Sequence, residues 1–476
     1  MFKNISLQTL TVFLMSLLQV ISIMILARLL SPLIFGQLAA ASVLLALATM
    51  FSEIGIGSAI VQRKESNLEF VNTALVLSTL LFCCLSILIY FLAPYIADYN
   101  NDKSLTSIIR YLIIPFVFSG LSGVPKGLLL RNLEYKKLLY VNVIPFFISI
   151  NLLSIILALY EFGIWSLVIG QTLNGIFIFI LSMYYSNIKI KPTINFSYIK
   201  DLIYFGGGIT LSRLFNYFTV AGDKVILGNT ISLEFLGFFE RLYKVSSVIS
   251  SQIGSVFDNI IFPIFSKKQD DYRESVQLYY KSIELASLIG LFFSLVLPLF
   301  ADELTLIILG SQWISYSYIL QLLLLLPFTR LLTRIGDAIL RSQAMVYQSA
   351  VVKFFSAIIT LGGLYIASKY EYYWFPIVYF ASSLFTLITL HILISYRIKS
   401  NLLKFFSILI KTIFSVSLII LPLWIFVFIS ESMLSFINLF IIKFIYLTIT
   451  AYLLYRKPIL LGQNFNNIIK LLKKSK

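Results

Sequence analysis

The most regular series of mainly polar positions lies on a predicted helix over residues 236–265. Its members follow one another at spacings of three and four residues: Arg241, Lys244, Val248, Ser251, Ser255 and Asp258. These spacings place them on one face of a helix. Charged side chains within a bilayer are costly and usually face a cavity or a partner. We therefore expect this face to line water or a polar substrate.

A second polar face is expected on the preceding helix, where Arg213 and Asn216 lead to Asp223. The carboxylates of the predicted helices are too few to neutralise all of their cations. An arginine in this environment needs an anionic partner, and its guanidinium binds phosphate or carboxylate groups through two parallel hydrogen bonds. Arg213, Arg241 and Lys244 are therefore predicted to bind an acidic group of a substrate.

A third polar stripe occurs at the inner end of a predicted helix over residues 316–341, and we interpret it as a cytoplasmic gate. Its members are spaced by four, three and four residues: Arg330, Arg334, Asp337 and Arg341. Two isolated lysines, Lys411 and Lys443, are instead expected to snorkel towards the membrane surface or to pair locally.

The helices that carry these residues must span a membrane. Of the 476 residues, 59% are hydrophobic and only 12% are charged. A soluble domain has about 25% charged residues, so much of this protein's exterior must face lipid. Continuous apolar runs of about twenty residues predict membrane-spanning helices, because a β-barrel would show short alternating segments. We therefore expect an all-α integral membrane fold.

About fourteen membrane-spanning helices are predicted from the apolar runs. They cover residues 9–30, 37–61, 71–95, 107–129, 138–160, 163–186, 203–224, 236–265, 279–300, 316–341, 349–368, 373–396, 404–429 and 434–456. The net charge of +16 is explained by topology rather than by a nucleic-acid partner. With both termini in the cytoplasm, nearly all loop cations fall on the cytoplasmic side. The longest external loops are then expected at 98–106, 222–235 and 302–315, too short for an external catalytic domain.

A weak internal repeat divides the predicted helices. Residues 27–36 and 227–237 share a Leu/Ser-containing turn that ends in glycine, although composition bias could imitate so short a match. We expect two parallel pseudo-symmetric lobes of six helices, at 1–186 and 203–396. A cytoplasmic linker at 187–202 would join them. Residues 397–476 would add two helices and a basic tail.

No metal site is predicted. Cys83 and Cys84 are adjacent within an apolar run, and His391 is the single histidine. Neither arrangement has the spacing of a metal site.

Two blocks of sequence resemble the bacterial polysaccharide exporters, and more narrowly the Wzx-type flippases of the MOP superfamily, which also contains the MATE transporters. The first block runs from Ala27-Arg-Leu-Leu-Ser-Pro to the Glu53-Ile-Gly-Ile-Gly-Ser segment. The second contains Asp223-Lys-Val-Ile-Leu-Gly, Leu236-Gly-Phe-Phe and Ile261-Phe-Pro-Ile-Phe-Ser. Phe238 replaces the tyrosine that usually follows Leu-Gly in this family.

The resemblance implies a flippase in a bacterial cytoplasmic membrane, not an enzyme. It would move undecaprenyl-diphosphate-linked oligosaccharide, such as O-antigen, capsule or teichuronic-acid-like units, by alternating access through a cationic cavity. The residues expected to contact this substrate are Arg110, Arg213, Asn216, Arg241, Lys244, Ser251 and Ser255. Those expected to form charge pairs or to carry a coupling ion, H⁺ or Na⁺, are Glu53, Asp223, Asp258 and Glu284. No other cofactor is implied, and a polysaccharide polymerase or assembly complex is a further expected partner.

Two alternatives remain at this stage. One is an ion-coupled exporter of drugs or organic anions with the same architecture; the cationic bias of the predicted helices disfavours cationic drugs. The other is a membrane-embedded glycosyltransferase or polymerase, which would normally need a large external loop.

Overall fold

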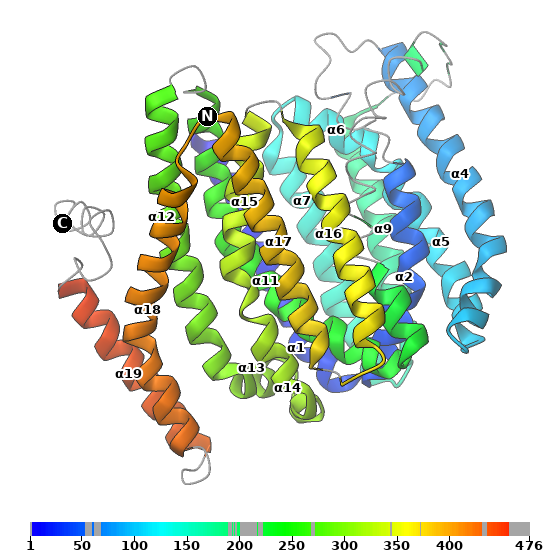
Figure 1. Cartoon of the computed structure of the whole chain (residues 1–476). Coiled ribbons are helices and arrows are strands. Elements are labelled where there is room, and N and C mark those ends of the chain that lie inside the picture. The colour runs from blue at the N-terminus through cyan, green and yellow to red at the C-terminus, as the bar shows by residue number, and fades with distance from the viewer. Residues whose placement is uncertain are drawn as a thin grey trace. The chain divides into compact units, whose positions relative to one another are not determined.

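The computed structural model describes residues 2–52, 60, 68–188, 193, 195, 198–199, 217, 222–267, 272–342, 345–371, 373–430 and 436–456. Every regular element in this part of the chain is helical (Figure 1). Contacts divide the chain into two compact units: residues 1–241 with 308–312, and residues 242–307 with 313–476. The boundary between them falls within one long helix, α11 (Leu233–Lys267).

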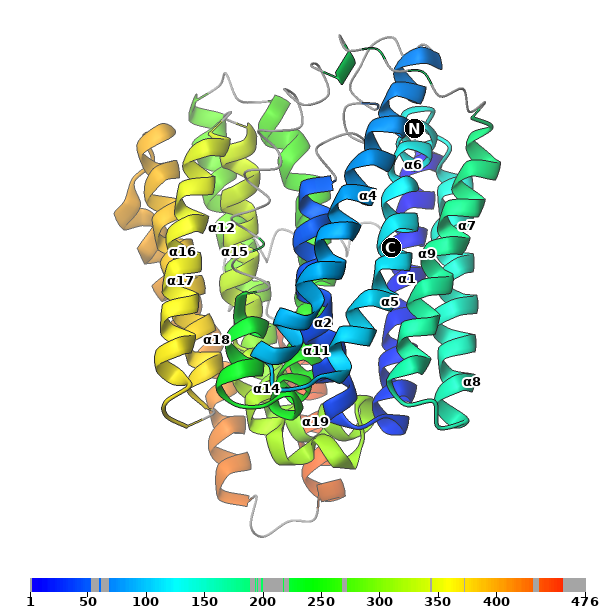
Figure 2. The same ribbon diagram turned by 90° about the vertical axis from the view of Figure 1, so that its right-hand side faces the viewer.

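The first unit is a bundle in which α4 packs on α5, α5 on α9, α2 on α5, and α1 on α7 (Figure 2). Its helices are α1 (Phe2–Leu29), α2 (Pro32–Ser52), α4 (Leu68–Tyr99), α5 (Ser104–Leu121), α6 (Gly123–Arg131), α7 (Tyr135–Phe146), η1 (Phe147–Leu153), α8 (Ser154–Leu159) and α9 (Ile164–Ser186). Residues 222–230 are also helical. One predicted helix, 138–160, contains the π-helical turn η1, where the buried amide of Asn151 has no hydrogen-bond partner among the described residues.

In the second unit α12 packs on α15 and α18, and α17 packs on α15 and α16. Its remaining elements are α12 (Tyr272–Val296), η2 (Leu297–Phe300), α13 (Ala301–Ile308), η3 (Ser311–Tyr316), α14 (Ser317–Leu323), α15 (Leu326–Ser342), α16 (Val346–Ala367), α17 (Trp374–Arg397), α18 (Leu402–Ser430) and α19 (Phe436–Arg456). His391 is fully buried in the core of this unit. Its ring lies 3.0 Å from the Tyr279 hydroxyl and 3.3 Å from the carbonyl oxygen of Leu332, and it stacks on Phe405.

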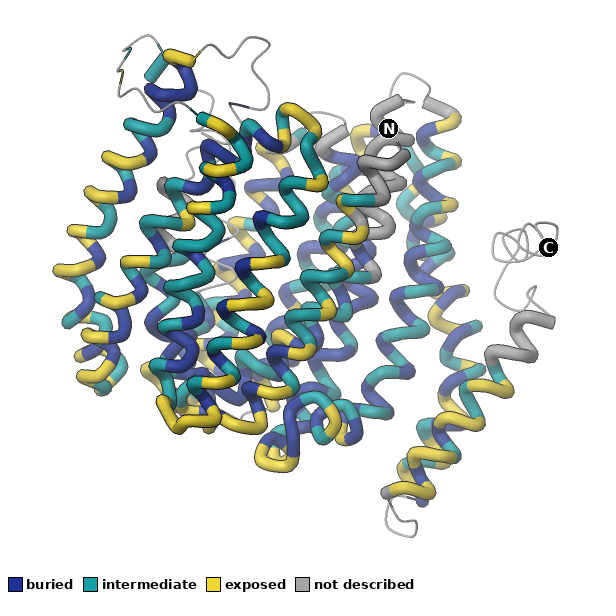
Figure 3. Tube along the Cα trace, turned by 180° about the vertical axis from the view of Figure 1, so that it is seen from behind, coloured by how far each residue is buried: buried dark blue, intermediate teal, exposed yellow. Residues whose placement is uncertain are grey.

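Apolar side chains cover the exterior of the helices. Along α4, Ile87, Leu88 and Phe91 are all more than half exposed, and exposed residues recur along the outer faces of α18 and α19 (Figure 3). Exposed apolar surfaces of this extent on long apolar helices are typical of contact with lipid. Aromatic residues gather near helix ends, as at Tyr95 and Tyr160, which is typical of the membrane interface.

Among the described residues, nine helices are long and apolar enough to cross a membrane, or ten if one bent pair counts as a single span. This confirms a multi-span, all-helical membrane protein. The complete count of fourteen and the cytoplasmic location of both termini stay predictions, because part of the chain, including most of the predicted helix 203–224, lies outside the described residues.

Several predicted boundaries are wrong. The predicted helix 316–341 is two helices, α14 and α15, which bend by 42°. The loop expected at 222–235 is helical up to residue 230, and the loop expected at 302–315 contains α13 and most of η3. The two loops were predicted from their low hydropathy. Polar side chains can nevertheless lie in helices when distant segments supply their hydrogen-bond partners. Asn229, for example, donates to the carbonyl oxygen of Tyr99.

The turn between α4 and α5 gives a test of the first unit's fold. Asp102 accepts hydrogen bonds from the backbone and hydroxyl of Ser104, at 2.9 and 2.6 Å, and from Nε2 of Gln37 in α2, at 2.7 Å. Burial alone would raise the pKa of Asp102, but these hydrogen bonds outweigh it and lower the pKa below 3.8. The stabilisation is therefore present above the unfolded-state pKa of about 4 and is lost as pH falls through the lower, folded-state value.

We expect Ser104→Ala to reduce the dependence of thermal stability on pH between about 5 and 3, because it removes the hydroxyl donor to Asp102. The measurement is the melting temperature of the purified protein across this range, with Ser107→Ala, in the same helix, as control. Identical acid profiles for Ser104→Ala and the unsubstituted protein would contradict the assignment. The effect should be small, since this carboxylate is only partly buried and is screened by solvent.

Candidate functional site

The N-terminal ends of α2 and α11 cross at two glycines. A Cβ atom added at Gly36 would overlap the carbonyl oxygen of Leu233, and one added at Gly237 would overlap that of Pro32. Gly36 thus contacts Leu233, four residues before Gly237, and Gly237 contacts Pro32, four residues before Gly36. These are equivalent positions of the two copies of the sequence repeat, 201 residues apart (237 − 36 and 233 − 32). The equivalent glycines of the predicted repeat therefore pack on each other.

Arg241 follows this crossing by one helical turn. Its guanidinium carbon lies 4.0 Å from the centroid of the Phe35 ring, a cation–π contact. Its Nε atom is buried and has no hydrogen-bond partner among the described residues. A buried guanidinium with an unused N–H donor can bind an anionic ligand with little rearrangement of the surrounding side chains.

A glutamine from a distant segment caps the neighbouring helix. Gln312 donates from Nε2 to the carbonyl oxygens of Ala27 and Leu30, at the C-terminal end of α1. Carbonyl groups in the last turn of a helix generally need donors from outside the helix. Gly310, at φ +108°, makes this approach possible and packs on the side chain of Arg28. This contact ties residues 308–312 to the first unit.

In the second unit, α11 meets the arginine stripe of α15 through Tyr243 and Gly254. Gly254 leaves room for the guanidinium of Arg334, since an added Cβ would lie 2.5 Å from its Nη1 and 2.7 Å from its Cδ. The guanidinium of Arg330 lies 4.9 Å from the ring centroid of Tyr243, and this ring lies 5.4 Å from that of Tyr379 in α17. The arginine stripe of α15 thus forms a cationic surface with α11, which we name the α11–α15 surface: Tyr243, Gly254, Arg330 and Arg334. Tyr243 and Gly254 lie beside the predicted stripe of α11 and are not members of it.

The acidic member of the α15 stripe is neutralised by the next helix. Asp337 lies 2.8 Å from the ammonium nitrogen of Lys353 and accepts a hydrogen bond of 2.7 Å from Ser349, both in α16. This pair reduces the effect of Asp337 on the local charge. In the described part of the chain, no carboxylate lies within ion-pair distance of Arg330. The surface therefore remains cationic around Arg330.

The other predicted residues are dispersed. Lys244 is exposed, and Ser251 donates to Val248 of its own helix. Arg110 lies over the ring of Tyr90, at 4.1 Å. Asp223 is buried and accepts a hydrogen bond from the backbone of Lys224, whose ammonium group pairs with Glu240 at 3.1 Å. Glu284 is half-buried. Outside the described residues lie Arg213, Asn216 and Glu53, together with the side chains of Ser255, Asp258 and Arg341.

The buried ion pair between Lys443 and Glu303 is not predicted by the sequence. Lys443 was expected to snorkel or to pair locally, but its ammonium group lies 2.7 Å from Glu303, 140 residues earlier in the chain. A lone lysine in the apolar run of α19 was the only available signal, and it does not identify the partner. No group of three or more His, Cys, Asp or Glu side chains that could hold a metal ion occurs among the described residues.

Comparisons with known proteins agree with this architecture. A family model described as "Polysaccharide biosynthesis protein" matches residues 25–318. The lipopolysaccharide biosynthesis protein WzxC of Escherichia coli is 26% identical over 313 residues, which are 64% of this chain and 62% of WzxC. The teichuronic acid biosynthesis protein TuaB of Bacillus subtilis is 24% identical over 300 residues, 61% of this chain and 62% of TuaB. The chain thus matches about three fifths of the length of these relatives.

Solved structures show the same fold. The lipid II flippase MurJ, in an inward closed conformation, has a TM-score of 0.70 at 14% identity, covering 95% of this chain and 99% of MurJ. An inward-facing multidrug MATE transporter of the MOP superfamily has a TM-score of 0.64 at 15% identity, covering 81% and 95%. These two solved structures are a flippase and a transporter, and at this level of identity they show the fold alone. The family model covers well over half of the chain, and the chain belongs to the polysaccharide biosynthesis protein family.

Proposed function

We propose that this protein is a flippase that moves undecaprenyl-diphosphate-linked oligosaccharide repeat units across a bacterial cytoplasmic membrane. The observation that carries the proposal is the α11–α15 surface, where arginines and an aromatic ring lie together in a chain with a MurJ-like fold. A glycan cannot cross the hydrocarbon layer unaided, because each hydroxyl would lose its hydrogen bonds to water. Guanidinium groups bind phosphate or acidic sugars, and aromatic rings supply an apolar face for a sugar ring.

The proposed mechanism is alternating access between two six-helix lobes, residues 1–186 and 203–396, around a cationic route. Arg330 and Arg334 would receive the acidic part of the substrate in the second unit, and Arg241 in the first. The glycine crossing of α2 and α11 would hold together the helix ends that the topology prediction places on the outer face. Opening there requires two backbones to separate, which is a discrete rather than a gradual change.

The MATE-like fold favours one second candidate, an ion-coupled exporter of drugs or organic anions. MATE transporters named as multidrug proteins share the architecture, so fold alone does not separate the two functions. Arg330, without a carboxylate partner in the described residues, favours an anionic over a cationic substrate. Energisation by H⁺ or Na⁺, and docking of a polysaccharide polymerase, belong to this proposal as further steps to be tested.

Deletion of the gene should cause lipid-linked saccharide units to accumulate on the cytoplasmic leaflet and should reduce surface glycan strongly. The measurement combines surface glycan with the total amount of extracted lipid-linked saccharide and with its accessibility, before extraction, to a glycosidase added outside intact spheroplasts. Restored export after re-expression would support the flippase. Unchanged glycan and lipid-linked saccharide, together with a changed sensitivity to organic anions, would favour the second candidate.

A further inference from the structure

The helix formed by α12 and α13 changes geometry at Pro298, where the short 3₁₀ element η2 separates the two. A proline has no N–H group and interrupts the hydrogen-bond ladder of a helix. Carbonyl oxygens near such a break need other donors. In this protein two of them receive donors from the last two helices: Trp424 of α18 donates to Leu295 at 2.8 Å, and Lys443 of α19 donates to Leu299 at 2.5 Å.

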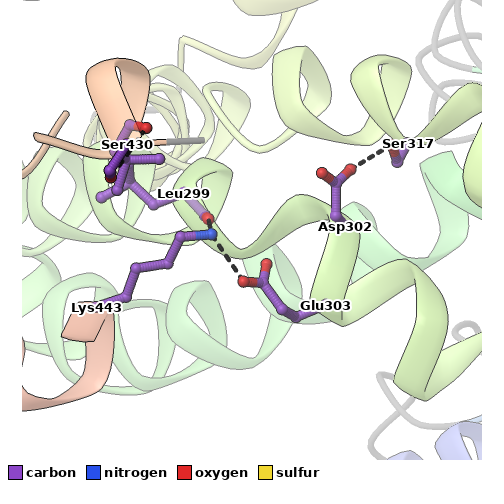
Figure 4. A network of polar contacts seen from close by, with 7 residues as sticks. Leu299, Asp302, Glu303, Ser317, Ser430 and Lys443 are labelled. Atoms are coloured by element: carbon purple, nitrogen blue, oxygen red, sulfur yellow. Dashed lines mark hydrogen bonds and ion pairs between the residues drawn. The ribbon is translucent and has the colours of Figure 1, made fainter. Parts of the chain in front are cut away.

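Lys443 also neutralises a carboxylate at the same place. Its ammonium group lies 2.7 Å from Oε1 of Glu303, in the first turn of α13, and the two side chains are only 5% and 3% exposed (Figure 4). The neighbouring carboxylate, Asp302, is directed to Ser317 of α14 instead. Within the described residues, Lys443 is thus the only cation within ion-pair distance of Glu303.

α19 packs along α18 and also reaches the break at Pro298 through two side chains. Phe440 packs edge-to-face on Phe300 of η2, with ring centroids 5.9 Å apart, and Lys443 lies one turn further along. Tyr446 donates to Ile419 of α18 at 2.7 Å. A lysine that only needed to avoid hydrocarbon would extend to the membrane surface. Lys443 is instead directed into the protein, towards a carboxylate and a carbonyl.

We propose that Lys443 and Glu303 are a positioning pair that fixes α19 to the break between α12 and α13, and that transport requires this attachment. The ammonium group lies between Oε1 of Glu303 and the carbonyl oxygen of Leu299, two oxygens that a small cation could otherwise share. The fixed charge of Lys443, rather than a mobile ion, therefore balances Glu303. The requirement for transport rests on the proposed flippase function, whereas the attachment does not.

The attachment predicts opposite pH dependences for two variants of the full-length protein. In Lys443→Met the buried carboxylate of Glu303 loses its counter-charge, so stability should be lost at pH 9 and should recover towards pH 5, where the carboxyl group can take up a proton. In Glu303→Gln the buried ammonium group is unbalanced, so stability should be lost at pH 5 and recover towards pH 9. The double variant should show neither dependence.

The measurement is the melting temperature of purified protein in nanodiscs between pH 5 and 9. Matched controls are Lys411→Met, an exposed lysine in α18, and Glu371→Gln, an exposed glutamate between α16 and α17; both should follow the unsubstituted protein. The attachment would be overturned if Lys443→Met and Glu303→Gln kept normal melting temperatures, or if both melting temperatures changed with pH in the same direction. This experiment needs no substrate, so its result is independent of the proposed function.

Measuring export distinguishes a role of Lys443 in transport from a role in stability alone. At matched abundance, Lys443→Met should lower surface glycan about tenfold or more, since breaking a buried pair leaves one charge unbalanced. Lys443→Arg keeps the charge and the donors and should retain most of the export. Wild-type export by Lys443→Met at matched abundance would overturn the positioning role, even if the pH profiles behave as expected. Failure of every variant and of the deletion to change glycan would instead refute the flippase function.

Discussion

Valine in place of Gly237 should abolish export and lower the melting temperature of the protein. A Cβ atom at this position overlaps the carbonyl oxygen of Pro32 and comes within 2.9 Å of the backbone nitrogen of Gly36. The obstacle is backbone rather than a flexible side chain, so α2 and α11 would have to move apart. Overpacking of this kind costs about 1–3 kcal/mol or more. Because the two helix ends are the proposed point of closure, we expect surface glycan to fall by more than about tenfold.

The crossing is pseudo-symmetric, so the same prediction applies to Gly36. Gly36→Val overlaps the carbonyl oxygen of Leu233 in the same way, so the two variants should have the same phenotype. Gly123→Ala and Gly362→Ala are suitable controls, because a Cβ at either position meets nothing within 4 Å. Both lie within helices, where alanine is favoured over glycine by about 1 kcal/mol. Normal export and stability in Gly36→Val or Gly237→Val would show that the two helix ends are not in close contact.

The double variant Arg330→Gln/Arg334→Gln should lose export while it keeps its abundance and melting temperature. Both arginines are only partly buried, and glutamine preserves much of their packing. Each charge-assisted hydrogen bond to an anionic ligand contributes about 1.5–3 kcal/mol. Loss of two such bonds should therefore reduce transport by two orders of magnitude or more, at about tenfold per 1.4 kcal/mol. The measurement is surface glycan at matched protein abundance, with exposed Arg397→Gln as control.

A second variant tests the position of the guanidinium without removing its charge. In Gly254→Ala the added methyl group would lie 2.5–2.7 Å from three atoms of Arg334, so this side chain must shift. Export should fall several-fold, because a bidentate contact depends on geometry as well as on charge. If the double arginine variant exports normally, the α11–α15 surface does not bind the substrate. If the double arginine variant loses export and Gly254→Ala exports normally, transport requires the arginine charges but not the present position of the Arg334 guanidinium.

The sequence was sufficient for properties that depend on local pattern. Composition and apolar run length predict a helical membrane protein, because hydrocarbon leaves the backbone few alternatives. The turn that ends in Gly36 and Gly237 predicts a repeat, and the structure adds that the copies touch. Helical periodicity also groups Arg330 and Arg334 of α15, which both contact α11, since side chains three and four residues apart share a face in any helix.

Only the tertiary structure decided which of these faces and charges meet. Arg334 lies against Gly254, Arg241 against Phe35, and Lys443 against Glu303, pairs that are separated by 80, 206 and 140 residues (334 − 254, 241 − 35, 443 − 303). Hydropathy likewise misplaced the loop at 222–235 and overlooked the bend between α14 and α15. The physical reason is the same in each case. Hydrophobicity and periodicity are properties of a segment, whereas the partner of a buried charge, or of a carbonyl freed at a helix break, is set by packing between segments distant in the chain.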